Sequence, residues 1–133
     1  DGMTYPGKKA ASEKETKAMM RFVNGISGLR EALNYHSMGS ILYWNYNVEG
    51  MPALYGRQKA LAEKVNQFTG YRLMPKSIST DPNGGFGDWL IYNKKIPNVT
   101  VETGSIMCPL PHSQLGKITR ENSSLLSWFA GSR

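Results

Sequence analysis

The stretch LREALNYHS, residues 29–37, decides how the chain folds. It predicts a buried β-strand over residues 29–36, whose apolar run stops abruptly at a polar pair, His36 and Ser37. Proteins of the α/β class place binding and catalytic groups at the carboxyl ends of strands. His36 is therefore a candidate functional residue. A lone histidine at a strand end is more often structural, so this position alone leaves both interpretations open.

Helical and extended patterns alternate along the rest of the chain. Apolar residues recur at helical spacing from Pro52 to Thr69; Pro52 suits a first turn, and Gly70 suits the left-handed position after the last one. Further helices are predicted over residues 12–23, 88–92 and 118–129, with Ser12 (in a capping box with Glu15) and Asp88 as N-caps. Further strands are predicted over residues 40–46, 71–74 and 98–102. Strands separated by helices predict a three-layer α/β arrangement.

A second ionisable group ends another predicted strand. NVTVE, residues 98–102, alternates as a strand does and ends in Glu102. An ionisable side chain after an apolar stretch is costly unless it has a partner or a task. Glu102 therefore joins His36 as a candidate, with a strand-end surface charge as the other interpretation. His112 lies in a predicted loop and is interpreted as a surface residue, and the chain contains no HxxE or HExxH pair.

Composition and charge bound the class of protein. With 133 residues, of which 40% are hydrophobic, the chain is predicted to form one globular unit. Its net charge of +6 favours acidic partners such as nucleic acid, anionic lipid or anionic cell-wall polymer. Nucleic-acid binding is not expected, because it rests on charge alone and no arginine stripe with interleaved aromatic residues is present. No apolar run approaches the roughly 20 residues of a membrane span. Cys108, the single cysteine, excludes an internal disulfide.

Four short motifs, taken in order, resemble one enzyme family. They are SEKET at residues 12–16, ALNYHS at 32–37, GGFGDW at 84–89 and VTVETG at 99–104. In the zinc carboxypeptidase family they resemble, in turn, the SEPET segment, the strand ending in the third zinc-binding histidine, the GGSxDW element and the strand of the catalytic glutamate. The ending PNVTVETG…PLP…ITREN is similar to bacterial members of that family, the γ-D-glutamyl-(L)-diamino-acid peptidases, which act on peptidoglycan stem peptides.

The resemblance implies the C-terminal half of that family's catalytic domain, a three-layer α/β/α fold with a mixed sheet, as one unit over residues 1–133. The family's HxxE zinc pair and substrate-binding arginines precede the SEPET segment and are absent here. By the resemblance, His36 is the third zinc ligand. Glu102 is the general base and acid that activates water and returns the proton to the leaving amine. We therefore expect an incomplete Zn²⁺ site and no catalysis by the chain alone.

The same resemblance places four further residues in the substrate-binding region. Ser37 follows the zinc ligand, where its backbone helps to shape the cleft, and Gly85 belongs to the glycine element. Thr80 occupies the position of a mobile substrate-capping tyrosine, so the usual tyrosine role does not carry over. Gly87 falls at the base of the specificity pocket, where the lack of a side chain gives no clue to the preferred substrate.

The expected partners follow from this interpretation. They are a peptide substrate, namely a peptidoglycan stem peptide, and the missing N-terminal half of the domain. An exposed sheet edge also predicts a homodimer or strand exchange. Action on cell-wall peptides implies an extracellular or cell-envelope location in a bacterium. The alternative is a non-catalytic binding module of the same fold that recognises wall polymer or a protein partner; the presence of both His36 and Glu102 argues against it.

Overall fold

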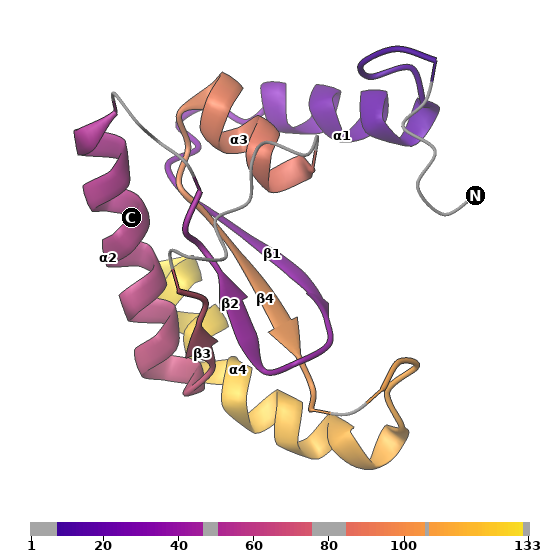
Figure 1. Ribbon diagram of the computed structural model, residues 1–133, viewed down its shortest axis with the longest axis vertical. Coiled ribbons are helices and arrows are strands. Elements are labelled where there is room, and N and C mark those ends of the chain that lie inside the picture. The colour runs from indigo at the N-terminus through magenta and orange to yellow at the C-terminus, as the bar shows by residue number, and fades with distance from the viewer. Residues whose placement is uncertain (1–7, 47–50, 76–84, 106, 132–133) are drawn as a thin grey trace. The chain divides into compact units, whose positions relative to one another are not determined.

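The computed structural model describes residues 8–46, 51–75, 85–105 and 107–131 (Figure 1). The chain divides into two compact units, residues 1–30 and 31–133, and each is described by itself. All strands found in the described ranges belong to the second unit, which therefore carries the candidate site. Within the same ranges, no helix combines the length and the apolar character needed to cross a membrane.

Helix α1 (Lys14–Asn24) belongs to the first unit. Its start shows that the predicted capping box is wrong: the N-cap is Glu13, and no side-chain cap hydrogen bond forms. Because the helix begins after Glu13, Ser12 lies outside the capping position and donates its hydroxyl to the Glu13 carboxylate at 2.6 Å. The helix ends at Gly25, as predicted, where the Gly25 N–H donates to the Arg21 carbonyl at 3.0 Å.

The second unit is built on a sheet. Its strands in the described ranges are β1 (Ala32–Ser37), β2 (Ile41–Tyr43), β3 (Arg72–Leu73) and β4 (Asn98–Thr103). Their order is β1-β4-β2-β3, so β4 lies between β1 and β2 (Figure 1). β4 runs parallel to β1 and antiparallel to β2, and β2 runs parallel to β3. The predicted α/β class with a mixed sheet is therefore confirmed, although β1 begins at residue 32 rather than 29.

Helix α2 (Pro52–Thr69) has the bounds that the sequence predicts. Pro52 occupies the first turn, where its missing N–H costs no helical hydrogen bond. Gly70 adopts the left-handed conformation, with φ 67°, and its N–H donates to the Asn66 carbonyl at 2.8 Å. This C-cap lets the chain turn directly from α2 into β3.

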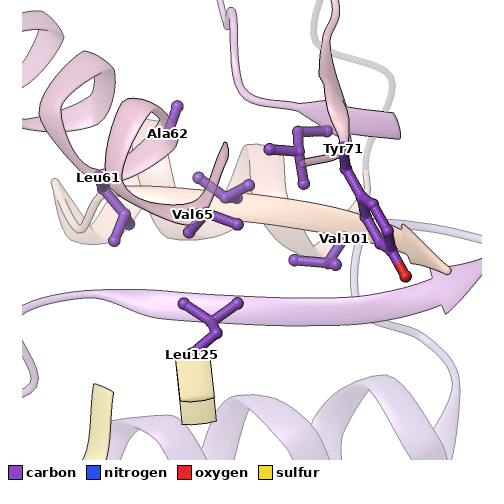
Figure 2. Packing of buried hydrophobic residues seen from close by; sticks show 8 residues of the cluster. Leu61, Ala62, Val65, Tyr71, Val101 and Leu125 are labelled. Atoms are coloured by element: carbon purple, nitrogen blue, oxygen red, sulfur yellow. The ribbon is translucent and has the colours of Figure 1, made fainter. Parts of the chain in front are cut away.

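The core lies between α2, α4 (Leu115–Gly131) and one face of the sheet (Figure 2). The buried cluster combines apolar side chains from both helices and from the strands or their flanks: Leu42, Leu61, Ala62, Val65, Tyr71, Val99, Val101 and Leu125. Val99 and Val101 alternate with the polar residues of β4, so β4 turns its apolar side toward α2 and α4. Glu102 therefore points to the opposite face.

Helix α3 (Phe86–Lys94) covers that opposite face near the start of β4. Gly87, in its first turn, is buried against the side chain of Asn98, which lies on the polar side of β4. The N-cap is Gly85, so the prediction that Asp88 caps the helix is wrong. Asp88 acts from the third helical position instead, where its carboxylate accepts the Gly85 N–H at 2.9 Å. Helices thus lie on both sides of the sheet, which gives the predicted three layers.

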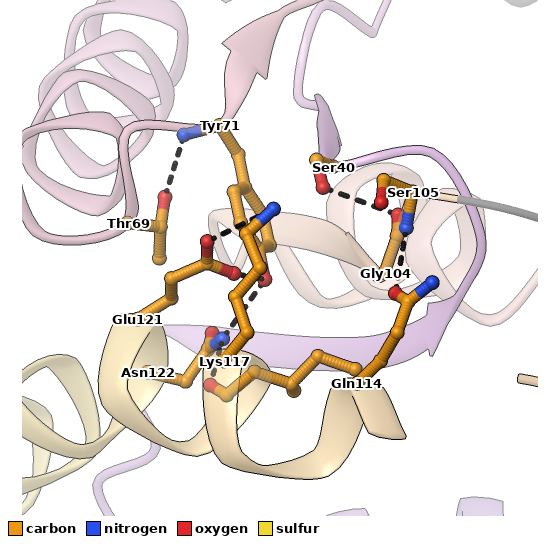
Figure 3. Close-up of polar contacts among 10 residues, drawn as sticks. Ser40, Thr69, Tyr71, Gly104, Ser105, Gln114, Lys117, Glu121 and Asn122 are labelled. Carbon is orange, nitrogen blue, oxygen red and sulfur yellow. Dashed lines mark hydrogen bonds and ion pairs between the residues drawn. The ribbon is translucent and has the colours of Figure 1, made fainter. Parts of the chain in front are cut away.

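Hydrogen bonds around Tyr71 tie α4 to the sheet (Figure 3). The Tyr71 hydroxyl donates to Glu121 at 2.8 Å and accepts from the side-chain amide of Asn122 at 3.1 Å. Asn122, which is buried, accepts in turn from the Tyr35 hydroxyl at 3.2 Å. Burial raises the pKa of Tyr71 to about 12. The network therefore joins α4 to β1 and to the segment that enters β3, with Tyr71 as a neutral phenol.

We expect the free energy of unfolding to fall as the pH rises through the range in which Tyr71 titrates. The unfolded tyrosine has a pKa of about 10, and the folded Tyr71 has a pKa of about 12. The stabilisation by this group is complete below the lower pKa and is lost as the pH rises toward the upper pKa. Between the two pKa values the unfolded chain releases the proton that the folded chain retains. Urea denaturation of the chain and of Tyr71→Phe at about pH 8 and about pH 11 measures the effect. Between these two pH values, Tyr71→Phe should lose less stability than the parent chain. Equal losses of stability would contradict the prediction.

Candidate functional site

His36 and Glu102 are direct neighbours in the sheet. Each is the penultimate residue of its strand, and the two are register partners in the parallel pair of β1 and β4. Register partners point to the same face of a sheet, so both side chains lie at the carboxyl ends of their strands, opposite the apolar face of β4. His36 is exposed and near enough to lower the pKa of the Glu102 carboxyl. The structure thus brings together the two residues that the sequence singles out.

The Glu102 carboxylate is partly withdrawn from water. Its Oε2 atom is buried, and no hydrogen-bond partner for this atom is found among the described residues. Burial raises the pKa of Glu102 above its ordinary value, and the nearby His36 opposes this shift. A carboxylate with a spare buried acceptor atom beside a histidine is suited to accept a proton from a bound molecule.

Side-chain and main-chain hydrogen bonds fasten the two strand ends together. The Thr103 hydroxyl donates to the His36 carbonyl at 3.0 Å. The Gly104 carbonyl accepts from the Gly39 N–H at 2.8 Å. It also accepts from the Ser40 hydroxyl at 3.1 Å (Figure 3). Gly104 adopts a left-handed φ of 77°, a conformation that suits glycine. The turn between β1 and β2 is therefore tied to the end of β4, directly beside His36 and Glu102.

The start of β4 is anchored by Gln58 of α2, a residue that no sequence motif marks. Its side chain is only 1% exposed. Its Oε1 accepts the Asn98 N–H at 2.8 Å, and its Nε2 donates to the carbonyls of Asn98 and Trp44. One amide thus bridges β4 and the segment that follows β2. The sequence does contain a clue to this role. Gln58 lies between Leu54 and Leu61 on the buried side of the helix, where an amide without hydrogen-bond partners would be costly.

Ser37 ends β1 directly after His36. Its hydroxyl accepts a hydrogen bond from the exposed Cys108 thiol at 3.3 Å. The segment that follows β4 therefore folds back toward the end of β1. His112 lies farther along that segment, in the short 3₁₀ helix η3 (His112–Gln114), and is exposed, in line with its interpretation as a surface residue.

The predicted substrate-binding glycines lie at the other end of β4. Gly85 is the N-cap of α3, and Gly87 is buried beside Asn98, the first residue of β4. From Asn98 to Glu102 the extended strand spans about 13 Å. The structure therefore does not bring these glycines next to Glu102. Thr80 lies outside the described residues, and the substrate-binding roles of Gly85, Gly87 and Thr80 stay predictions.

Among the described residues, His36 has the donor chemistry of a zinc ligand. Within the described ranges, no group of three or more His, Cys, Asp and Glu side chains is arranged to hold a metal ion. A catalytic zinc takes about three protein ligands and keeps one position for water or substrate. The exposed His36 at its strand end fits as one of these ligands. The others would have to come from outside the described residues.

Comparison with known proteins places the chain near a family of enzymes and a curated relative. A family model described as zinc carboxypeptidase matches residues 2–124. Among curated proteins, the chain is similar to gamma-D-glutamyl-L-diamino acid endopeptidase 1 of Lysinibacillus sphaericus, with 26% identity over 117 residues. The matching segment covers 88% of this chain and 28% of that relative. The chain therefore spans less than a third of the relative's length.

Proposed function

Since the chain belongs to the zinc carboxypeptidase family, we propose that it forms one part of the active site of a zinc metallopeptidase. In this proposal His36 is a zinc ligand and Glu102 is the general base. The observation that carries it is the pairing of His36 with Glu102 at the carboxyl ends of two parallel strands. The unpartnered, buried Oε2 of Glu102 supports the same conclusion, because it leaves an acceptor free for a reacting molecule.

The chemistry of Glu102 follows from its surroundings. Its carboxylate takes a proton from the attacking water and returns it to the amine that leaves when the peptide bond breaks. Burial raises its pKa, which brings the carboxyl closer to the range in which one group both accepts and donates a proton. A bound zinc ion would supply the polarisation of the scissile carbonyl and a lower pKa for water. His36 would hold that ion without blocking Glu102, since both extend from the same face.

The proposed substrate is a peptide of the bacterial cell wall that contains a γ-D-glutamyl bond to an L-diamino acid. The name of the Lysinibacillus relative supports this class of substrate. The net charge of +6 suits work on an anionic wall. Such a substrate implies an extracellular or cell-envelope location.

The remaining zinc ligands and the group that polarises the substrate carbonyl are proposed to come from a preceding part of the domain. The short coverage of the relative supports this arrangement, as does the lack of a metal-holding group among the described residues. The chain alone is then expected to be inactive and to bind zinc weakly. Such a chain would contribute its strands to a larger sheet. The edge strands of the described sheet are β1 and β3.

A fusion tests this proposal. The part of the Lysinibacillus relative that precedes the matching segment is joined to this chain, and zinc content and hydrolysis of a γ-D-glutamyl-L-lysine peptide are measured. We expect about one zinc per folded fusion and cleavage of this peptide but not of its α-L-glutamyl analogue. His36→Ala should remove most of the zinc, because the site loses one of about three protein ligands. A folded fusion that holds zinc equally well without His36 would contradict the proposal.

A further inference from the structure

The residue after Glu102 contacts the main chain of His36. The Thr103 hydroxyl donates to the His36 carbonyl at 3.0 Å. The register partner of Thr103 is Ser37, so the side chain reaches diagonally to the residue before its own partner. The bond therefore links the backbone of one candidate residue to the direct neighbour of the other.

The hydroxyl acts without occupying the site itself. Successive side chains of a strand alternate between faces, so Thr103 lies on the face of Val101, whereas Glu102 and His36 share the opposite face. The bond ends on a main-chain carbonyl and leaves the imidazole unused. Thr103 thus restrains the backbone of His36 from behind the sheet while the ring stays available to a ligand.

Strand ends need such a restraint. The penultimate position of a strand lies next to the point where regular pairing stops, and local opening of the backbone costs least at such ends. A metal ligand must nevertheless keep its geometry to within about 0.5 Å. The bonds from the Gly39 N–H and the Ser40 hydroxyl to the Gly104 carbonyl hold the turn after β1. The Thr103 bond adds a side-chain contact to the His36 carbonyl itself, beside the main-chain pairing of β1 with β4.

We propose that Thr103 is a positioning residue whose hydroxyl fixes the backbone of His36 beside Glu102. The functional meaning of this role rests on the proposed zinc site. The restraint itself is a property of the chain and is open to measurement without metal or substrate. This restraint differs from a general stabilisation of the fold, because it requires the Thr103 hydroxyl and acts only at one end of the pair β1 and β4.

The test compares three variants of this chain by nuclear magnetic resonance. Thr103→Val removes the hydroxyl and keeps the branched shape, Thr103→Ser keeps the hydroxyl, and Thr100→Val removes a hydroxyl of the same strand that approaches Tyr46 instead. The readouts are amide hydrogen exchange and the side-chain order of His36 from imidazole ¹³C relaxation. The internal control is the Ala32 N–H, which donates to the Pro97 carbonyl at 2.9 Å at the other end of the same pair of strands.

We expect Thr103→Val to speed exchange at the Gly39 amide about fivefold, the effect of losing one hydrogen bond, and to lower the order of the His36 ring. Exchange at Ala32 should not change. In both Thr103→Ser and Thr100→Val, the exchange rate of the Gly39 amide and the order of the His36 ring should equal those of the parent chain. The inference would be overturned if the His36 ring lost order in both Thr103 variants, or if Thr103→Val changed neither readout. It would also be overturned if Thr103→Val accelerated amide exchange at Ala32 as much as at Gly39. Failure of the zinc proposal would appear elsewhere, as a fusion whose zinc content does not depend on His36.

Discussion

Replacing Glu102 with glutamine should lower the turnover of the fusion by about a thousandfold, the effect expected when a general base is lost, and leave its zinc content unchanged. The amide has the size of the carboxylate but cannot take a proton from water. His36→Ala should lose zinc and turnover together, so the two substitutions separate the roles of base and ligand. Turnover near the parent value in Glu102→Gln would reject Glu102 as the base. Loss of zinc in that variant would instead make Glu102 a metal ligand.

The same substitution, which lowers turnover, should keep or raise the stability of the chain. Burial without a hydrogen-bond partner disfavours a charged group, and Oε2 of Glu102 is in this situation among the described residues. At neutral pH, Glu102→Gln is therefore expected to unfold at the same or a higher urea concentration than the parent chain. Glu121→Gln is the matched control. That carboxylate accepts the Tyr71 hydroxyl at 2.8 Å and pairs with Lys117 at 3.4 Å, and replacing these charge-assisted contacts with those of a neutral amide should destabilise. A destabilised Glu102→Gln would show that the carboxylate is a structural group.

The second large effect is expected from Gly87→Ala, which should lower the free energy of unfolding by about 2 to 3 kcal/mol. A Cβ atom at this position would lie 2.6 Å from Nδ2 of Asn98 and closer still to the hydroxyl of Tyr46. Both neighbours are buried and bonded to each other at 3.1 Å, so neither moves freely. The lack of a side chain at Gly87 thus has a packing reason that is independent of any substrate pocket.

Gly56→Ala adds the same atom in a different setting. Gly56 is exposed in the interior of α2, and a Cβ there would meet no atom within 4 Å. Alanine should stabilise this position by about 0.5 to 1 kcal/mol, because it favours the helix. Urea denaturation of both variants measures the contrast, and Tyr46→Phe in the Gly87→Ala background should recover part of the loss. Equal shifts in Gly87→Ala and Gly56→Ala would reject the steric explanation.

Local pattern was sufficient for the long elements of the fold. The periodicity of residues 52–69, with proline before and glycine after, gives the correct bounds of α2. Alternation in residues 98–102 likewise predicts β4. Helix starts were harder, because a shift of one or two residues decides which side chain caps. Glu13 rather than Ser12, and Gly85 rather than Asp88, occupy the N-cap positions.

From local pattern the candidate site could be predicted only as two separate strand ends, and the family resemblance alone placed both residues in one site. Nothing local in the sequence states that His36 and Glu102 are partners, because the register of a parallel pair depends on the packing of the whole sheet. The supporting residues were missed for the same reason. Gln58 acts through hydrogen bonds to Asn98 and Trp44, and Thr103 through one to His36, and each contact joins distant parts of the chain.

The parallel pairing of β1 with β4 also has a consequence for how the molecule forms. Its closing contact, between Thr103 and His36, joins residues 67 positions apart in the sequence. Contacts of such long range are made slowly, because the entropy of closing a long loop is lost before the contact contributes. Helix α2 needs only contacts between neighbouring residues and is therefore expected to form early. We therefore expect His36 and Glu102 to meet late in folding, so that partly folded chains, in which peptide segments are still open to attack, do not yet hold the assembled pair.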